Sequence, residues 1–348
     1  MYKSNIKISE ITAGHIQGIA TDKERKYMYY SFTTALIKTD IDGNIIGSVK
    51  GLAGHLGCIA YNYEDGKVYG SLEYKHDVIG REILQRIDSN IDITDGFYVV
   101  SFDVEKIDRL DMDAETDGIM VAVHLKEVLD DYKADGHRYG CSGIDGITFA
   151  PVPGNCEGKK YLYVAYGIYS DKQRKDNDYQ VILRYNIEGW GEFAKPLDQK
   201  NMHRQGPKEP DSKYFVYTGN TAYGVQNLEY DEATKYMFMA VYKGEKEEFP
   251  NFPMFVVDMK KETKKEKLIS IDQHGEVMQL ATVGQKDEST GIWGIDFPYG
   301  STGVISLGDG HFYFSRNFSV DDSWGTDIGL YLFENHNFTE LGEGSKEH

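Results

Sequence analysis

The sequence predicts an all-β protein, because short runs of β-branched and aromatic residues alternate with tight-turn sequences along almost the whole chain. Turn sequences such as Asp42-Gly43-Asn44, Glu64-Asp65-Gly66-Lys67 and Asp309-Gly310 separate many of these runs. The expected strands are, in chain order, Lys26–Thr34, Lys67–Tyr74, Phe97–Val104, Lys160–Ile168, Gln180–Ile187, Lys235–Tyr242, Met254–Met259, His311–Ser315 and Gly329–Phe333. The only convincing helical pattern is short and lies around Leu125–Tyr132.

A weak internal repeat organises these strands. In most of five similar segments, a small residue precedes a β-branched or leucine residue that opens a strand. The five strand openers are Ile19, Ile59, Ile147, Leu228 and Val304. In three of the segments a short turn and an aromatic strand follow, as in the inner two strands of a β-propeller blade, where small residues suit the crowding around the axis. The repeat therefore predicts a five-bladed β-propeller. Six or seven blades stay open as alternatives, because each longer gap has room for a second blade.

The N-terminal run Ile6–Ile11 is expected to complete the last blade and so close the ring. We expect one domain over residues 1–348, since the strand pattern is continuous. Its 38 Lys+Arg and 56 Asp+Glu give a formal net charge of −18. No basic stripe is present, so no nucleic-acid partner is expected. The apolar runs are too short to span a bilayer, so no membrane partner is expected either.

The three cysteines, Cys58, Cys141 and Cys156, are odd in number and lack CxxC spacing. This pattern fits a reducing compartment and argues against a disulfide framework or a structural zinc site. The N-terminus shows no apolar segment typical of a secretory signal. We therefore expect a cytoplasmic protein.

Loop elaboration on one face of the ring indicates where a site should lie. The long insertions are Lys75–Gly96, Lys126–Gly140, Tyr169–Tyr179, Asp198–Lys213, Lys243–Pro253, Ala281–Gly300 and Phe318–Asp327. We assign them to the two kinds of connection that emerge on the same face of a propeller. The repeat register then places polar residues at the mouth of that face.

A divalent metal ion is one expected occupant of this mouth. His15 and His55 stand at the same register in adjacent blades, and Gln17 and Gln226 point the same way, so these four form the expected ligand set. The competing interpretation is that each histidine caps the backbone of a neighbouring blade.

Acid–base groups are the second expectation. Glu73 and Asp145 are the candidate carboxyls and His55 is a third candidate catalytic group. The alternative is that the carboxylates bond the backbone of inner strands. Glu229 is also a carboxyl near the axis, but alternation along its strand places it on the opposite side from Gln226.

The upper ends of the second strands supply candidate substrate contacts. Tyrosines there are suited to stacking on a sugar ring, and cations are suited to an anionic group of the substrate. The expected substrate-binding residues are Lys75, Tyr166, Tyr169, Tyr242, Arg316 and Asn317.

The segments His15–Asp22, His55–Asn62 and Asp145–Pro151 resemble the inner strands of bacterial β-propellers, and the blade count is similar to that of five-bladed propeller glycosidases. The three spaced carboxylates of those glycosidases have no match here. A second similarity is to metal-dependent propeller polysaccharide lyases, whose central metal is held by His and Gln. For that second group, His15, Gln17, His55 and Gln226 are the matching residue types.

These observations predict a carbohydrate-active enzyme, a glycoside hydrolase or lyase acting on a small oligosaccharide at the central mouth. Two alternatives stay open. One is a lactonase-like metal-dependent hydrolase, in which metal-bound water attacks an ester. The other is a non-catalytic ligand-binding or interaction propeller, which should instead carry apolar patches on its rim.

Overall fold

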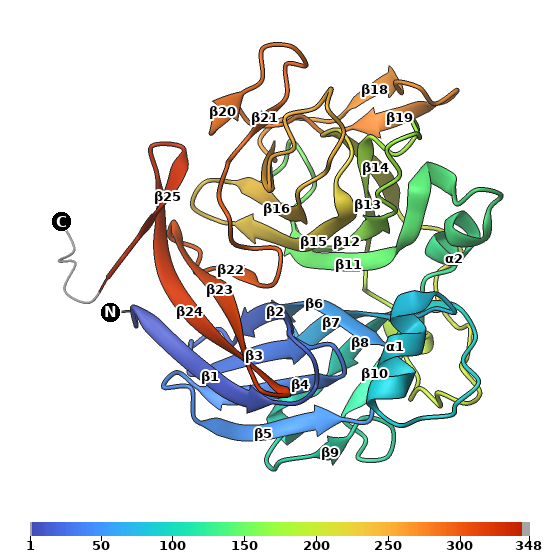
Figure 1. The fold of residues 1–348 in the computed structure, drawn as a ribbon, viewed down its shortest axis with the longest axis vertical. Helices are drawn as coiled ribbons and strands as arrows, with labels where there is room; N and C mark the ends of the chain where they lie inside the picture. The colour runs from blue at the N-terminus through green and yellow to red at the C-terminus, as the bar shows by residue number, and fades with distance from the viewer. Residues whose placement is uncertain (1, 343–348) are drawn as a thin grey trace.

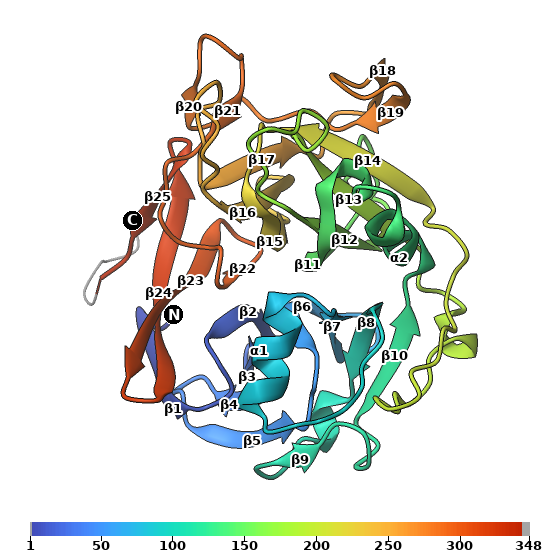
Figure 2. The same cartoon turned by 45° about the vertical axis from the view of Figure 1, so that its right-hand side comes forward.

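A computed structural model describes residues 2–342 of the chain. Five mainly antiparallel sheets stand around a central axis, each with one edge strand at the centre, and together they form a five-bladed β-propeller (Figures 1 and 2). The predicted fold class and blade count are confirmed. The extra length of the later blades lies in connections and added edge strands, and not in further blades.

The strands of each blade are given from the axis outward. Blade 1 contains β2 (Ile16–Thr21), β3 (Tyr27–Phe32), β4 (Ala35–Asp40), β5 (Ile45–Lys50) and, paired in parallel with β5, β9 (Met112–Asp113). Blade 2 contains β6 (His55–Asn62), β7 (Lys67–Tyr74), β8 (Gly96–Phe102) and β10 (Met120–His124). Blade 3 contains β11 (Cys141–Ala150), β12 (Tyr161–Ile168), β13 (Tyr179–Tyr185) and β14 (Ser212–Tyr217), extended by β19 (His274–Val277) and β18 (Lys264–Lys267). Blade 4 contains β15 (Ala222–Asp231), β16 (Tyr236–Tyr242) and β17 (Met254–Asp258).

Blade 5 contains strands from both ends of the chain. It comprises β22 (Val304–Ser306), β23 (His311–Val320), β24 (Ser323–Glu334), β1 (Asn5–Ile11) and β25 (Asn337–Glu340). The N-terminal strand β1 pairs antiparallel with β24, with Ile6 opposite Ile328. The expected closure of the ring by Ile6–Ile11 is therefore confirmed, and β1 leaves β24 with a partner on both sides.

Each predicted strand opener lies in an innermost strand, β2, β6, β11, β15 or β22. These strands crowd together: a Cβ atom on Gly18 would stand 2.7 Å from the backbone nitrogen of Ile59 in the next blade. Polar side chains also join the blades around the axis, both adjacent blades and blades that are not adjacent. The Ser31 hydroxyl donates to the Gly57 carbonyl over 2.7 Å, and the Asn227 amide donates to the Gln17 carbonyl over 2.8 Å.

The hydrophobic core consists of layers between blades. Within residues 2–342 there are five buried clusters, and each contains side chains from two adjacent blades. Each blade therefore has a buried cluster on both of its faces. This explains why strands such as Ile16–Thr21 are buried along their whole length. No helix in the described part of the chain is both long and apolar enough to cross a membrane.

The connections differ from expectation in three places. The first is helix α1 (Val78–Arg86), which lies in a segment that the sequence indicated to be a polar loop. The other α-helix, α2 (Lys126–Lys133), lies where the sequence predicted one. The predicted loop Phe318–Asp327 is mostly strand, because β23 and β24 continue to a tight turn after Val320.

The insertion 198–213 leads into β14, the fourth strand of blade 3, and so does not belong to either expected kind of connection. It follows a segment that crosses back to blade 2, where Lys195 pairs with Ala122 at the edge of β10 (Figure 2). Three short 3-10 helices, Val104–Lys106, Arg138–Gly140 and Trp190–Glu192, and the two-residue pair β20 (Gln285–Lys286) and β21 (Trp293–Gly294) complete the elements.

Candidate functional site

A cavity of about 320 Å³ opens at the axis, at the end of the ring where the inner strands begin. Residues of blades 1 to 4 and of helix α1 line it. The lining residues are His15, Gln17, Thr33, His55, Glu73, Lys75, Asp77, Ile79, Glu82, Ile83, Arg86, Ser142, Asp145, Tyr169, Tyr223, Gln226 and Tyr242. The register of the repeat thus brings most of the predicted site residues together.

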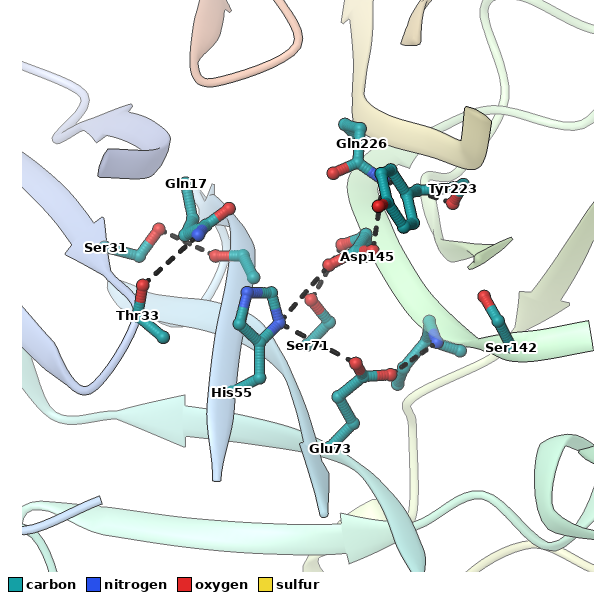
Figure 3. A network of polar contacts seen from close by, with 12 residues as sticks. Gln17, Ser31, Thr33, His55, Ser71, Glu73, Ser142, Asp145, Tyr223 and Gln226 are labelled. Carbon is teal, nitrogen blue, oxygen red and sulfur yellow. Dashed lines mark hydrogen bonds and ion pairs between the residues drawn. The ribbon is translucent and has the colours of Figure 1, made fainter. Parts of the chain in front are cut away.

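His55 lies between two carboxyl groups (Figure 3). Its Nδ1 atom is 3.5 Å from Asp145 Oδ1 and 3.8 Å from Glu73 Oε1. Strand pairing places Glu73 directly opposite His55 within blade 2, whereas Asp145 comes from the inner strand of blade 3. The side chains of His55 and Asp145 are each 13% exposed, so both are reached from the cavity.

Lys75 neutralises Glu73 inside the wall of the cavity. The Lys75 ammonium is 2.6 Å from Glu73 Oε1 and donates to the Ser142 carbonyl over 3.0 Å. The second oxygen of Glu73 accepts the backbone N–H of Ile144 over 3.1 Å. Burial opposes the charge on Lys75, but the carboxylates of Glu73 and Asp77 outweigh it and raise the pKa of the ammonium group. Glu73 and Lys75 therefore form a buried ion pair with few free bonding positions.

The protonation states of His55 and Asp145 follow from the same burial. Burial, assisted by the positive charge of Lys75, lowers the pKa of His55 to about 3, so its imidazole is neutral near pH 7. Burial raises the pKa of Asp145 well above its usual value, and the charge of Glu73 acts in the same direction. A neutral imidazole therefore stands beside a carboxyl group that holds its proton more tightly than a free aspartic acid does.

A glycine makes room for this arrangement. Gly143 has a φ of +134°, and a Cβ atom at this position would overlap Glu73 Oε2. Any larger residue would push Glu73 away from Lys75 and Ile144.

His15 lies on the blade 1 side of the cavity. Its Nε2 atom is 3.1 Å from the amide nitrogen of Gln17, which also donates to the Thr33 hydroxyl over 3.3 Å. The ring packs against Trp324 with centroids 5.5 Å apart. Burial and the charge of Arg86 lower the pKa of His15. This side of the cavity therefore offers neutral hydrogen-bonding groups.

The four predicted metal ligands do not form one donor set. His15 and Gln17 bond to each other, whereas the Gln226 amide donates to Asp145 Oδ2 over 3.2 Å. The Lys75 ammonium already supplies the positive charge beside Glu73 on this side of the cavity. Across residues 2–342, no group of three or more His, Cys, Asp or Glu side chains is arranged to hold a metal ion. The metal ion expected at this mouth therefore stays a prediction.

Helix α1 forms one wall of the cavity, through Ile79, Glu82, Ile83 and Arg86. The Asp77 side chain caps it by accepting the Gly80 N–H over 2.9 Å. Sequence reasoning missed this helix, although an aspartate before Val78 and apolar residues four apart at Ile79 and Ile83 were available signals. Arg86 was consequently missed as a site residue.

Of the predicted substrate contacts, Lys75, Tyr169 and Tyr242 line the cavity, and they are joined by Tyr223, which was not predicted. Tyr223 and Tyr242 form an edge-to-face pair with centroids 6.0 Å apart. Their rings supply flat surface at the mouth.

Three predicted contacts are corrected. Tyr166 is fully buried and donates its hydroxyl to Asp131 over 2.8 Å, so it belongs to the core between blades 2 and 3. Arg316 lies against β24 beside Gly329, with an ion pair to Glu340, and so does not line the cavity. Asn317, its neighbour in β23, does not line it either. The reason is that β23 continues past the mouth as regular strand.

Comparisons with known proteins identify no family. No family model matches the chain, and no curated protein matches it. Among solved structures, the soluble aldose sugar dehydrogenase from Escherichia coli in its apo form is 10% identical, covers 92% of this chain and 99% of its own, and has a TM-score of 0.36. The holo form of the pyranose dehydrogenase PQQ domain from Coprinopsis cinerea is 9% identical, with 90% and 82% covered and a TM-score of 0.40. The Dos1 propeller is 11% identical, with 93% and 81% covered and a TM-score of 0.33. Similarities this low leave the fold class resting on the sheet topology of the chain: it is a five-bladed β-propeller with a polar cavity at one mouth.

Proposed function

We propose that the chain is an enzyme that cleaves a small carbohydrate at the axial cavity by acid–base chemistry. The observation that carries this proposal is the pairing of His55 and Asp145, which approach within 3.5 Å at the wall of one cavity, with the pKa of the imidazole lowered and that of the carboxyl raised by burial. General acid–base catalysis needs a group able to accept a proton and a group able to donate one.

The two groups favour a lyase over a hydrolase. Glycoside hydrolysis commonly uses a second carboxylate as nucleophile or base, but Glu73 is held by Lys75 and by the Ile144 N–H. In an elimination, His55 accepts the proton from the carbon next to the sugar carboxylate. The electron pair of that C–H bond forms a carbon–carbon double bond, the bond to the glycosidic oxygen breaks, and Asp145 protonates the leaving oxygen.

An acidic sugar is the substrate that this chemistry requires, and Arg86 is the group suited to it. Lys75 is already paired with Glu73, whereas no carboxylate among the described residues lies within ion-pair distance of Arg86. A guanidinium group binds a carboxylate through two parallel hydrogen bonds. Tyr223 and Tyr242 would hold the sugar ring by stacking.

The test is to incubate the purified protein with short oligogalacturonides and oligoglucuronides, and with neutral oligosaccharides of the same length. Elimination gives one unsaturated product for each new reducing end, which is detected by ultraviolet absorbance. New reducing ends without that absorbance would show hydrolysis and overturn the elimination step. Saturable binding without turnover would indicate the non-catalytic alternative, and absence of binding would overturn the whole proposal.

A further inference from the structure

A second cavity, of about 330 Å³, opens at the other end of the propeller axis. The first cavity contacts the beginnings of the inner strands, at residues such as Gln17 and His55, whereas the second contacts their ends, at residues such as Ile19 and Tyr61. Nothing in the proposed reaction uses this second mouth.

Glu229 lies in the wall of this cavity, and it differs in type from the residues at the equivalent position of the other four blades. It follows the strand opener Leu228, and the residues that follow the other four openers are Ala20, Ala60, Thr148 and Ile305. One of the five blades thus carries an ionisable group where the others carry a small or uncharged residue. Burial of an unpaired carboxyl disfavours folding, so its presence needs a compensating role.

The contacts of Glu229 leave part of its carboxyl group available. One oxygen, Oε1, accepts the backbone N–H of Ser306 over 2.9 Å, and the Thr148 hydroxyl also bonds to the carboxyl group. Between residues 2 and 342, no lysine, arginine or histidine lies within ion-pair distance of it. Burial raises the pKa of Glu229 to about 8, so near neutral pH the carboxyl is mainly protonated and is a hydrogen-bond donor.

The throat above Glu229 is apolar and aromatic. Ile19, Ile59 and Ile305 line it together with Tyr61 and Tyr63. Tyr63 is 47% exposed, and its ring centroid lies 5.4 Å from that of Tyr61. An exposed tyrosine at a cavity mouth gives a flat surface for a ring of similar size.

The rim carries three cationic residues beside one partly exposed carboxylate, Glu232, although the chain has a net charge of −18. Lys23, Arg25 and Lys160 line the cavity, and Lys160 is paired with Glu232 over 2.6 Å. In the described part of the chain, neither Lys23 nor Arg25 forms an ion pair. Arg25 is held in place, since its guanidinium group donates to the Tyr2 hydroxyl over 2.6 Å and to the Leu307 carbonyl.

We propose that this second mouth binds a small ring-bearing organic carboxylate. Its ring would lie in the throat against Tyr61 and Tyr63, its carboxylate would meet Lys23 and Arg25, and a polar substituent on the ring would bond to Glu229. The site is separate from the proposed carbohydrate cavity, so its occupancy does not require the proposed reaction.

The experiment is isothermal titration of the full chain with para-hydroxybenzoate and with its neutral analogue para-hydroxybenzyl alcohol. We expect saturable binding of the carboxylate and at least tenfold weaker binding of the alcohol. The variant Lys23→Glu should weaken carboxylate binding about tenfold, a loss of about 1.4 kcal/mol. Lys26→Glu is the matched control, because exposed Lys26 lies three residues away and does not line the cavity.

Glu229→Gln provides a second reading, because glutamine keeps an acceptor for the Ser306 N–H and a donor for the ligand. We expect it to retain binding within a few fold, whereas Glu229→Ala should lose it. Equal affinity for acid and alcohol, or a Lys23→Glu variant that binds like Lys26→Glu, would overturn the proposal. Absence of saturable carboxylate binding would overturn it as well.

Discussion

The Nδ1 atom of His55 and the Oδ1 atom of Asp145 face each other over 3.5 Å across the boundary between blades 2 and 3, and neither has a hydrogen-bond partner among the described residues. Buried polar atoms are normally bonded. In the proposed reaction, a polar group of the substrate would form hydrogen bonds with these two atoms. The predictions below test this arrangement and the groups around it.

Asp145→Asn should lower turnover of an acidic oligosaccharide by about 10²- to 10⁴-fold, because the amide cannot protonate a leaving oxygen. The raised pKa of Asp145 means that its contribution to stability is full below about pH 3.8, the usual value, and is lost as pH rises toward the folded-state pKa. Relative to the unmodified chain, the variant should therefore gain stability at neutral pH. Kinetics and urea unfolding at two pH values measure both effects. A fully active variant would remove Asp145 from the mechanism.

His55→Gln should make folding less sensitive to acid. The pKa of His55 in the folded chain is about 3 against 6.5 for a free histidine, so its contribution to stability is full above about pH 6.5 and is lost as pH falls toward 3. Between pH 7 and pH 5 the unmodified chain should lose about 2 kcal/mol more than the variant. Urea unfolding measures this difference, and His76→Gln, at an exposed histidine, is the control. An equal loss in both proteins would contradict the neutral imidazole.

Lys75→Met should destabilise the chain by about 3–5 kcal/mol, since it leaves the Glu73 carboxylate buried without its cation. The double variant Glu73→Gln/Lys75→Met should recover part of that loss, because no unpaired charge remains. Lys50→Met is the control: Lys50 forms an exposed ion pair with Asp111, and such pairs contribute about 0–1 kcal/mol. Equal losses at Lys75 and Lys50 would show that the buried pair is not formed.

Gly143→Ala should reduce activity although it replaces no polar side chain of the cavity. The new methyl group would occupy the space of Glu73 Oε2 and shift that carboxyl away from the Ile144 N–H. We expect a stability loss of about 1–3 kcal/mol, from the strained φ as well as from the overlap. Thermal unfolding and kinetics measure it. The control Gly189→Ala has a positive φ but open space around it, so it isolates the backbone effect.

Arg86→Gln should weaken binding of acidic oligosaccharides about tenfold and leave neutral ones unchanged, because it removes one charge from the cavity wall. Arg81→Gln on the same helix is the control, since Arg81 donates to the His76 carbonyl and does not line the cavity. Titration with uronic and neutral sugars measures the selectivity. Parallel losses for both sugar types would assign Arg86 a structural role.

The sequence alone determined the ring and the central residues of the site. His55 and Asp145 each precede the strand opener of their blade, Ile59 and Ile147, and so lie toward the end of the axis where the inner strands begin. Glu229 follows its strand opener and lines the second cavity, at the other end of the axis from Gln226. The small residues of the repeat indicated inner strands because larger ones would collide, as at Gly18.

The tertiary structure alone decided which helix, loop residues and added edge strands pack around the ring of blades. Helix α1 is short and contributes to the cavity only by packing beside strands of other segments, so Arg86 could not be placed from periodicity. Tyr166 and Tyr169 look alike in the sequence, yet Tyr166 is buried by a partner from α2, Asp131, and Tyr169 is left at the mouth. Similarly, β18 and β19 join blade 3 from a region that follows blade 4 in sequence. Such pairings depend on which edge is free after the blades have assembled, and that information lies in no local pattern of residues.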